Sequence, residues 1–189
     1  MRASFEHIKE LVEECAKLPG DFAEVGVWKG DTFAPLCRWA HLVGKKAYAI
    51  DSFEGMGEPT ESDYQGGNCH YPAGALSVGG GPGVSAVMRK CGVSASSAII
   101  LRGWIPTVFN EIADGITFAF AHVDVDHFRP TQQSLDFFWP RMVKGGVLCC
   151  HDWTPKRGCL ASKAFDDFIW ENKLKAEGPT QSAHGWVRK

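Results

Sequence analysis

The sequence lacks the features that would place it among nucleic-acid-binding, membrane-spanning or disulfide-stabilised proteins. Its 189 residues carry a formal net charge of -2 and no cluster of lysine and arginine. This composition argues against a surface for nucleic acid or anionic lipid. No run approaches the roughly 18 apolar residues that a membrane-spanning helix needs. The first residues, MRASFEHIKELVEEC, predict an amphipathic, acidic helix rather than a signal peptide.

The cysteines do not form a recognisable disulfide or metal framework. There are seven of them, an odd number, and no C-x-x-C spacing occurs. Most fall inside apolar helix or strand patterns, where a free cysteine behaves as a small hydrophobic residue. A reduced, cytoplasmic protein is the simplest interpretation. Apolar and charged contents of 44% and 22% are ordinary for a globular protein, so residues 1–189 are expected to form one domain.

Short apolar β-type runs alternate with segments of helical spacing along nearly the whole chain. This alternation predicts an α/β fold with a mostly parallel, doubly wound sheet. Helices are expected at 108–113 and 131–142, the second closed by Lys144-Gly145-Gly146. The tail predicts a final hairpin with its turn at His184-Gly185. The expected strands are residues 22–27, 46–50, 98–101, 116–123 and 147–150.

Residues 58–83 differ from the rest of the chain. They include Gly66-Gly67 and the run Gly79-Gly80-Gly81-Pro82-Gly83, and they show no clear periodicity. A loop of this length in a compact domain is usually functional or flexible. The segment is therefore expected to be a Gly-rich lid or a flexible loop.

The first expected strand ends in Glu24-Val-Gly26-Val-Trp-Lys-Gly30. Glycines at a strand-to-helix turn let the backbone approach a ligand closely, and the helix start offers free N–H groups. The dinucleotide pattern G-x-G-x-x-G and the phosphate-binding Lys-Ser/Thr are both absent, so a nicotinamide-dependent oxidoreductase is a poor alternative. A purely structural tight turn is the other interpretation of this motif.

Two further strand ends favour a nucleoside. Asp51 ends the second strand, where an acid commonly accepts hydrogen bonds from ribose hydroxyls. Gly103-Trp104 follows the third strand, and Trp104 either packs against an adenine ring or belongs to the core. Asp51 alone would equally suit a turn ahead of Ser52. Combined with Glu24 and the glycines, it favours a nucleoside-binding half of the sheet.

Acidic and histidine side chains follow the fourth and fifth strands, as HVDVDH at 122–127 and HD at 151–152. Buried carboxylates are costly unless they are paired or bound to metal, and adjacent parallel strands would bring these ends together. The set suits Mg²⁺ or Mn²⁺, with the histidine favouring Mn²⁺, Fe²⁺ or Zn²⁺ over Mg²⁺ alone. A hydrogen-bonded cluster without metal is the alternative, and His122 is expected to be a core histidine. The candidate ligands are Asp124, Asp126, His151 and Asp152.

Together these residues resemble the macrocin O-methyltransferase family, from about Phe5 to Lys189. The resemblance implies a Rossmann-like class I methyltransferase fold with seven strands and a C-terminal antiparallel hairpin. It also implies S-adenosylmethionine as methyl donor and a divalent cation, usually Mg²⁺. The motifs that carry it are residues 19–30, Asp51-Ser52-Phe53-Glu54-Gly55, Leu101 to Trp104, Gly145-Gly146 and His151-Asp152.

The family's motifs are carried over onto this chain residue by residue. Asp124 to Thr131 stand where the family has D-G-D-x-Y-x-S-T, and His151-Asp152 stand where it has D-D. That last departure leaves the identity and the use of a cation open. The cofactor-binding set that the resemblance implies is Glu24, Gly26, Gly30, Asp51, Ser52, Gly103, Trp104 and Asp124.

The sequence therefore predicts methyl transfer from S-adenosylmethionine to a hydroxyl of a sugar, another polyol or a secondary metabolite. Asp126 or His127 is the expected catalytic base, and a cation would lower the pKa of the hydroxyl. A metal-independent small-molecule methyltransferase and a catalytically inactive S-adenosylmethionine-binding protein are the alternatives. The expected partner is a small hydroxylated acceptor, not nucleic acid or membrane. The oligomeric state stays open, a homo-oligomer included.

Overall fold

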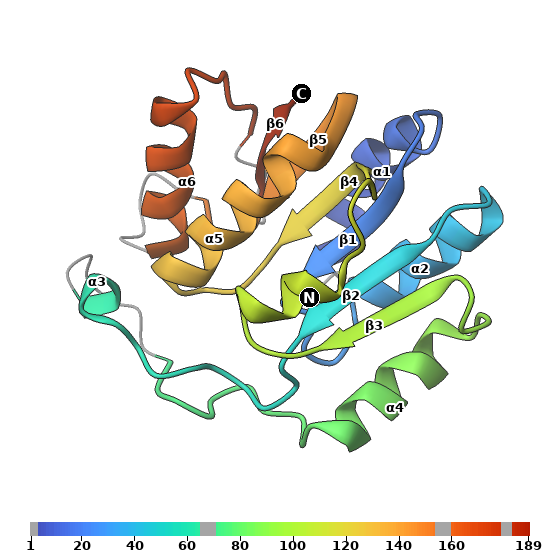
Figure 1. Cartoon of the computed structure of the whole chain (residues 1–189), viewed down its shortest axis with the longest axis horizontal. Helices are drawn as coiled ribbons and strands as arrows, with labels where there is room; N and C mark the ends of the chain where they lie inside the picture. The colour runs from blue at the N-terminus through green and yellow to red at the C-terminus, as the bar shows by residue number, and fades with distance from the viewer. Residues whose placement is uncertain (1–3, 65–70, 154–159, 179–182) are drawn as a thin grey trace.

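The computed structural model describes residues 4–64, 71–153, 160–178 and 183–189. Their central feature is a six-stranded sheet with helices on both faces (Figure 1). The strand order is β3-β2-β1-β4-β5-β6, and every neighbouring pair is parallel except β5 and β6. The predicted α/β fold with a mostly parallel sheet is confirmed. The strands are β1 (Asp21–Val25), β2 (Ala47–Asp51), β3 (Ala98–Arg102), β4 (Phe118–Val123), β5 (Met142–Cys150) and β6 (Gly185–Arg188).

The expected seventh strand is wrong for the described part of the chain, which has six. An isolated antiparallel bridge between Glu177 and Trp186 stands beside β6. Gly178-Pro179 follows Glu177 directly, and proline lacks the N–H that a strand ladder needs. The predicted turn at His184-Gly185 is also wrong, because Gly185 begins β6 and pairs with Cys150 of β5. The antiparallel arrangement at the C-terminal end is confirmed.

One face of the sheet is covered by helices from the first half of the chain. These are the 3-10 helix η1 (Ser4–His7), α1 (Lys9–Cys15), α2 (Phe33–Leu42) and α4 (Gly81–Cys91). Phe22, Phe33, Leu36 and Phe120 are fully buried in the apolar cluster on this side. Burying a side chain of this size contributes roughly 1.5–3 kcal/mol, so this layer fixes the orientation of β1 and β2.

The opposite face carries η2 (Thr107–Glu111), α5 (Phe128–Phe138) and α6 (Leu160–Glu171). Aromatic rings dominate this layer: Phe118 meets Phe138 edge to face with their centroids 4.9 Å apart, and Phe109 stacks on Phe137 at 4.3 Å. Phe118 belongs to β4 and Phe138 to α5, so their contact holds this strand against this helix. The acidic and histidine residues at 122–127 lie where β4 ends and α5 begins.

Several predicted boundaries need correction. The helix expected at 131–142 begins at Phe128 and ends at Phe138, followed by the 3-10 helix η3 (Trp139–Arg141). Pro140 explains this end, since it cannot donate the backbone hydrogen bond of an α-helix. Lys144-Gly145-Gly146 lies within β5 instead of closing a helix. The helix expected at 108–113 is the 3-10 helix η2.

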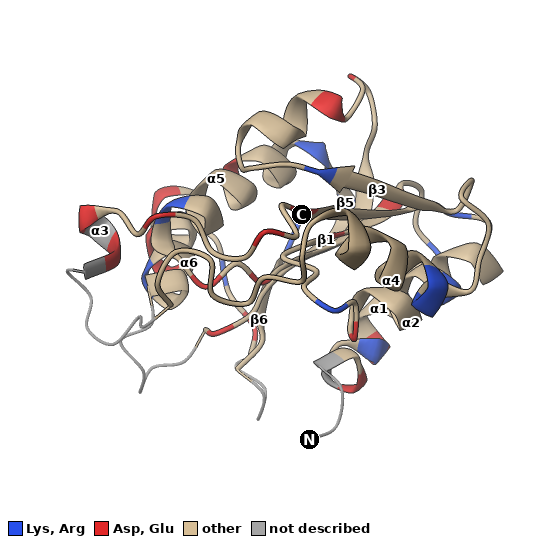
Figure 2. Ribbon diagram, turned by 90° about the horizontal axis from the view of Figure 1, so that it is seen from below, with Lys and Arg blue, Asp and Glu red and all other residues tan. Residues whose placement is uncertain are grey.

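Residues 58–80 contain little regular structure where they are described. The one helix there is α3 (Glu61–Tyr64), and residues 65–70 lie outside the described ranges. None of the helices in those ranges is long and apolar enough to cross a membrane. Lysine and arginine residues are spread over several elements (Figure 2). The described cysteines are buried and form no disulfide with one another, and Cys69 and Cys159 lie outside the description.

Candidate functional site

A cavity of about 660 Å³ opens beyond the carboxyl ends of the parallel strands. In open α/β sheets this edge is where ligands bind. Its walls come from the turns after β1 to β5, from the first residues of α5, and from residues within 55–63 and 71–76. Most of the predicted site residues line it: Gly26, Asp51, Ser52, Gly103, Trp104, Asp124, Asp126, His127, His151 and Asp152.

The turn after β1 is built around Gly26. Its φ is +84°, and a Cβ added there would lie 1.8 Å from the carbonyl oxygen of Asp124. Only glycine combines this backbone conformation with such a close approach. Gly26 therefore lets the end of β1 lie directly against the end of β4.

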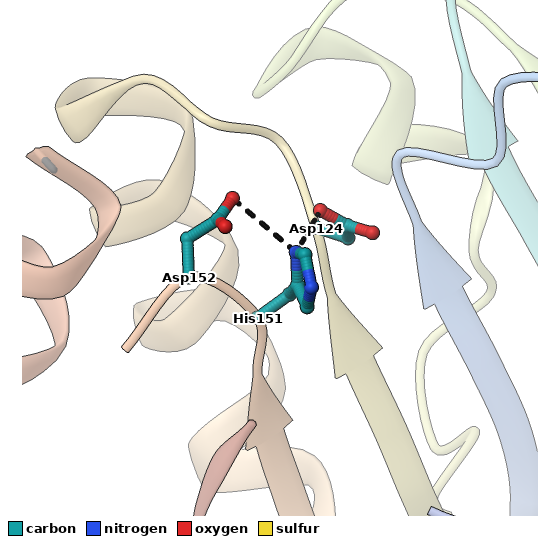
Figure 3. Close-up of side chains that lie close together, drawn as sticks. All are labelled: Asp124, His151 and Asp152. Carbon is teal, nitrogen blue, oxygen red and sulfur yellow. Dashed lines mark hydrogen bonds and ion pairs between the residues drawn. The ribbon is translucent and has the colours of Figure 1, made fainter. Parts of the chain in front are cut away.

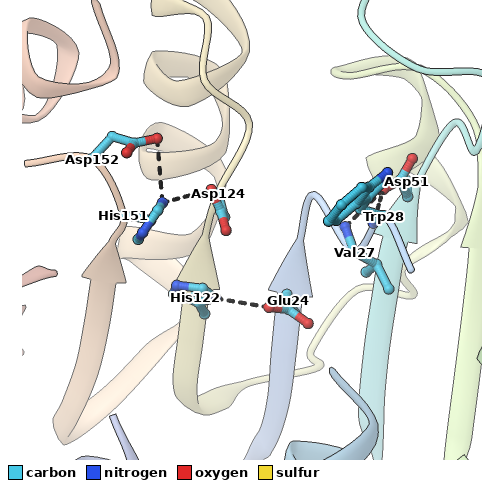
Figure 4. A network of polar contacts seen from close by, with 8 residues as sticks. All are labelled: Glu24, Val27, Trp28, Asp51, His122, Asp124, His151 and Asp152. Carbon is cyan, nitrogen blue, oxygen red and sulfur yellow. Dashed lines mark hydrogen bonds and ion pairs between the residues drawn. The ribbon is translucent and has the colours of Figure 1, made fainter. Parts of the chain in front are cut away.

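Asp51 organises the same turn from the neighbouring strand. Its Oδ2 accepts hydrogen bonds from the backbone N–H groups of Val27 at 2.7 Å and Trp28 at 2.8 Å (Figure 4). Its Oδ1 accepts a third bond from the N–H of Phe53 at 2.6 Å. An ionised carboxylate has about four lone-pair positions, so capacity for a ligand hydroxyl remains. Asp51 thus lies where a ribose contact was predicted, and it also shapes the glycine turn.

Two tryptophans present faces to the cavity. Trp104 is 47% exposed and lines the cavity, so the alternative that it belongs to the core is wrong. Trp28, 40% exposed, lines the same cavity and was not among the predicted site residues. Its φ of +48° is unusual for a bulky residue, and its place inside the glycine motif was the signal that could have found it.

The predicted acidic and histidine cluster is assembled at the ends of β4 and β5. The Nδ1 atom of His151 lies 3.0 Å from Asp124 Oδ1 and 3.2 Å from Asp152 Oδ2 (Figure 3). One ligand atom from each of these three residues lies within 4.8 Å of the others. Asp126 lies outside this compact group of three, although it lines the same cavity. Two carboxylates and an imidazole are a donor set that fits a divalent cation.

The electrostatics of the cluster favour positive charge at its centre. Burial acts to raise the pKa of Asp124, but the neighbouring His151 outweighs it and holds that pKa below its usual value. Burial disfavours the imidazolium form of His151, yet Asp124 and Asp152 raise its pKa to about 11. For Asp126, burial and then the charges of Asp124 and Asp152 raise the pKa to about 7. The two carboxylates therefore stabilise a cation between them, either a proton on the imidazole or a metal ion.

Two of the predicted cofactor-binding residues do not line the cavity. Glu24 is 1% exposed and pairs with His122, whose Nδ1 lies 2.9 Å from Glu24 Oε1 below the cavity (Figure 4). Burial, partly offset by that hydrogen bond, raises the pKa of Glu24 to about 7. Gly30 lies against Val87 of α4, and an added Cβ would be 3.1 Å from that side chain. Glu24 thus supports the strand ends from within the sheet, Gly30 serves helix packing, and His122 is a core histidine as predicted.

Asp63, which sequence reasoning missed, anchors the segment at 58–83 to α5. Its Oδ2 accepts hydrogen bonds from the backbone N–H and the hydroxyl of Thr60, each at 2.7 Å. Its Oδ1 accepts one from the N–H of Phe128 at 2.7 Å. Thr60-x-x-Asp63 is a capping-box spacing, and this was the available signal. Nearby, His127 Nε2 lies 3.3 Å from the carbonyl oxygen of Tyr71, a second contact between the segment and the start of α5.

Known proteins with the same sequence pattern are methyltransferases. The chain matches the family model described as Macrocin-O-methyltransferase (TylF) over residues 2–181. A Streptomyces olivaceus protein named 8-demethyl-8-(2,3-dimethoxy-alpha-L-rhamnosyl)-tetracenomycin-C 4'-O-methyltransferase is 28% identical over 144 residues. That match covers 72% of this chain and 54% of the relative. Demethyldecarbamoylnovobiocin O-methyltransferase of Streptomyces niveus is 25% identical over 156 residues, covering 78% of this chain and 59% of the relative. The chain therefore spans somewhat more than half the length of these two relatives.

Solved structures agree on the fold. The O-methyltransferase NovP superposes with a TM-score of 0.78 at 22% identity, covering 98% of this chain and 78% of that one. The calicheamicin methyltransferase CalS11 gives a TM-score of 0.78 at 17% identity, covering 97% and 77%. At these identities the likeness supports the fold alone. The family match over most of the sequence is the stronger finding, and by it the chain belongs to the macrocin O-methyltransferase (TylF) family.

Proposed function

We propose that this protein is an S-adenosylmethionine-dependent O-methyltransferase that methylates a hydroxyl of a sugar or another polyol, assisted by a divalent cation. The observation that carries the proposal is one cavity with two halves. The turn after β1, Asp51 and Trp104 line one half, and the Asp124–His151–Asp152 cluster lines the other. A donor and an acceptor bound in the two halves would meet at the ends of β1 and β4.

The first half suits the cofactor in both shape and chemistry. Trp104 offers an exposed aromatic face for an adenine, and a Cβ at Gly57 would lie 3.3 Å from its ring. Asp51 and Ser52 offer oxygen atoms to ribose hydroxyls, and Gly26 and Gly103 keep side chains out of the space. When bound, S-adenosylmethionine supplies an electrophilic methyl group on a sulfonium.

The second half prepares the acceptor hydroxyl. Asp124, His151 and Asp152 would hold the cation, whose charge lowers the pKa of a neighbouring hydroxyl. Asp126 or His127 then takes the proton. Without a cation, burial and then the charges of Asp124 and Asp152 raise the pKa of Asp126 to about 7. A cation held by those residues would lower it, so Asp126 would be ionised and able to accept a proton. His127 faces the cavity from the start of α5.

The rest of the rate enhancement comes from position. Holding a nucleophile in line with the methyl group supplies roughly 7–11 kcal/mol in favourable intramolecular cases. Residues Glu58, Thr60, Asp63, Tyr71 and Leu76 line the cavity on the side of the 58–83 segment. Residues 58–64 and 71–80 act as a lid that excludes water, and the contacts of Tyr71 with His127 and of Asp63 with Phe128 support that role.

Support for a sugar acceptor comes from a relative. The name of the Streptomyces olivaceus protein says that it is a 4'-O-methyltransferase of a tetracenomycin that carries a rhamnosyl group. The proposed acceptor is thus a small glycosylated molecule. Cytoplasmic location and a homo-oligomer stay predictions.

The proposal is tested by incubating the protein with methyl-labelled S-adenosylmethionine and a panel of free and aglycone-linked sugars, with and without chelator. Label in the acceptor, lost on chelation, is the expected result. Transfer that is unchanged by chelator would show that no cation takes part, and the protein would then be a metal-independent methyltransferase. Comparison of Asp126→Asn with His127→Gln identifies the base, since only its loss should lower kcat at unchanged cofactor affinity.

A further inference from the structure

We propose that His151 makes the cation site selective for Mn²⁺ and the neighbouring first-row transition metals over Mg²⁺. This rests on the proposed function only in using the same cluster at the ends of β4 and β5. It goes beyond that function because it assigns the chemical class of the cation. The family resemblance implies Mg²⁺ and a pair of aspartates, and this chain has His151 in place of the first one.

The geometry makes the imidazole nitrogen part of the donor set. Nδ1 of His151 is the atom that faces the carboxylates, at 3.0 Å from Asp124 Oδ1 and 3.2 Å from Asp152 Oδ2 (Figure 3). Three ligand atoms, one from each of these residues, lie within 4.8 Å of one another. The set is therefore one nitrogen and two oxygens.

One backbone contact and one ring contact position His151. Its backbone N–H donates to the carbonyl oxygen of Val123 at 2.9 Å, which continues the pairing of β4 with β5. Its ring lies 4.6 Å, centroid to centroid, from the ring of the fully buried His184. Nδ1 therefore lies between the two carboxylates, and a cation bound there would take the place of its proton.

The chemistry of this donor set decides between cations. Mg²⁺ is hard, prefers oxygen ligands and gives up its water reluctantly. Imidazole suits the first-row ions Fe²⁺, Ni²⁺, Cu²⁺ and Zn²⁺, and Mn²⁺ stands at the weak end of that series. Histidine in place of aspartate also removes one negative charge from the site, which weakens the attraction on which Mg²⁺ chiefly depends. Both effects favour a transition metal.

The test measures dissociation constants of the full chain for Mn²⁺ and Mg²⁺ by calorimetry, without cofactor. We expect Mn²⁺ to bind more tightly by about tenfold or more. His151→Asp should bring the two constants to within about threefold of each other. The matched control is His41→Asp, the same substitution on the exposed face of α2, which should leave both constants unchanged.

A spectroscopic readout makes the result independent of the variant's folding. Pulsed electron paramagnetic resonance of Mn²⁺ bound to the native protein should show modulation from a coordinated imidazole nitrogen. Equal affinities for the two ions, or Mn²⁺ without nitrogen modulation, would overturn the proposal. S-adenosylhomocysteine binding, measured separately, distinguishes the two ideas. Cofactor binding with no metal preference refutes this inference alone, and nitrogen-ligated Mn²⁺ without cofactor binding refutes the methyltransferase function alone.

Discussion

Replacing Gly26 by alanine should destabilise the protein far more than the same change at most other glycines. Gly26 has a φ of +84°, and the added Cβ would lie 1.8 Å from the carbonyl oxygen and 2.6 Å from the carbonyl carbon of Asp124. The left-handed conformation alone costs about 1–2 kcal/mol for a residue with a Cβ. Because the obstacle is backbone, no side chain can turn aside, and the end of β4 must move away from β1.

Gly44 supplies a matched control for this substitution. It also has a positive φ, +72°, but a Cβ there meets no atom within 4 Å among the described residues. We therefore expect Gly44→Ala to lose about 1 kcal/mol and Gly26→Ala about 3–5 kcal/mol. The difference isolates the close approach between the two strand ends.

The assay is urea unfolding followed by tryptophan fluorescence, with the m values compared to confirm a common unfolding transition. A loss in Gly26→Ala that equals the loss in Gly44→Ala would refute the packing argument. If Gly26→Ala folds, its displaced Asp124 should also weaken cation binding, which Gly44→Ala should leave intact. On a typical domain stability of about 5–15 kcal/mol, the larger loss remains measurable.

Three further predictions concern single side chains. Trp104→Ala should weaken S-adenosylhomocysteine binding about tenfold in calorimetry by removing an aromatic face, whereas Trp170→Ala, at an 83% exposed residue of α6, should not. The pKa of Glu24 is about 7 in the folded chain against 4.5 in the unfolded one, so stability is full below pH 4.5 and falls as the pH rises to 7, by on the order of 3 kcal/mol. In Glu24→Gln, the free energy of unfolding from urea titrations should no longer fall between about pH 5 and about pH 8. An unchanged fall would mean that a group other than Glu24 causes it. Asp63→Ala should cost about 2 kcal/mol of stability and speed amide hydrogen exchange at Phe128, because three hydrogen bonds are lost; unaltered exchange there would contradict the anchoring role.

The sheet could be predicted well because its parallel strands are buried on both sides. Val147 to Cys150 form a continuous, fully buried apolar run that ends sharply at His151-Asp152, and this contrast marks the strand end in the sequence. The strands at the C-terminal edge of the sheet were harder to predict. Glu177 makes a single bridge, and no local pattern separates one bridging residue from a short strand.

The structure gathers most of the predicted site residues around one cavity but places Glu24 outside its lining. Glu24 was expected at the ligand, but β1 lies next to β4 in the sheet, and their register places Glu24 opposite His122. That neighbour is 98 positions away, and nothing in the local sequence specifies which strands are adjacent. Trp28 and Asp63 each carry a local signal, the glycine motif and the capping-box spacing. They were missed because the contacts that bring them to the cavity and to α5 form only in the folded chain.

Calorimetric titration of the full chain with S-adenosylhomocysteine, first without added metal and then with Mn²⁺, tests the central claim most directly. Binding in the micromolar range, weakened by Trp104→Ala, is the result that the proposed function predicts. Heat on adding Mn²⁺ that disappears in Asp124→Ala would locate the cation at the ends of β4 and β5. Absence of binding under both conditions, in a protein whose fluorescence and unfolding transition show it to be folded, would contradict the assignment of this cavity to the methyl donor.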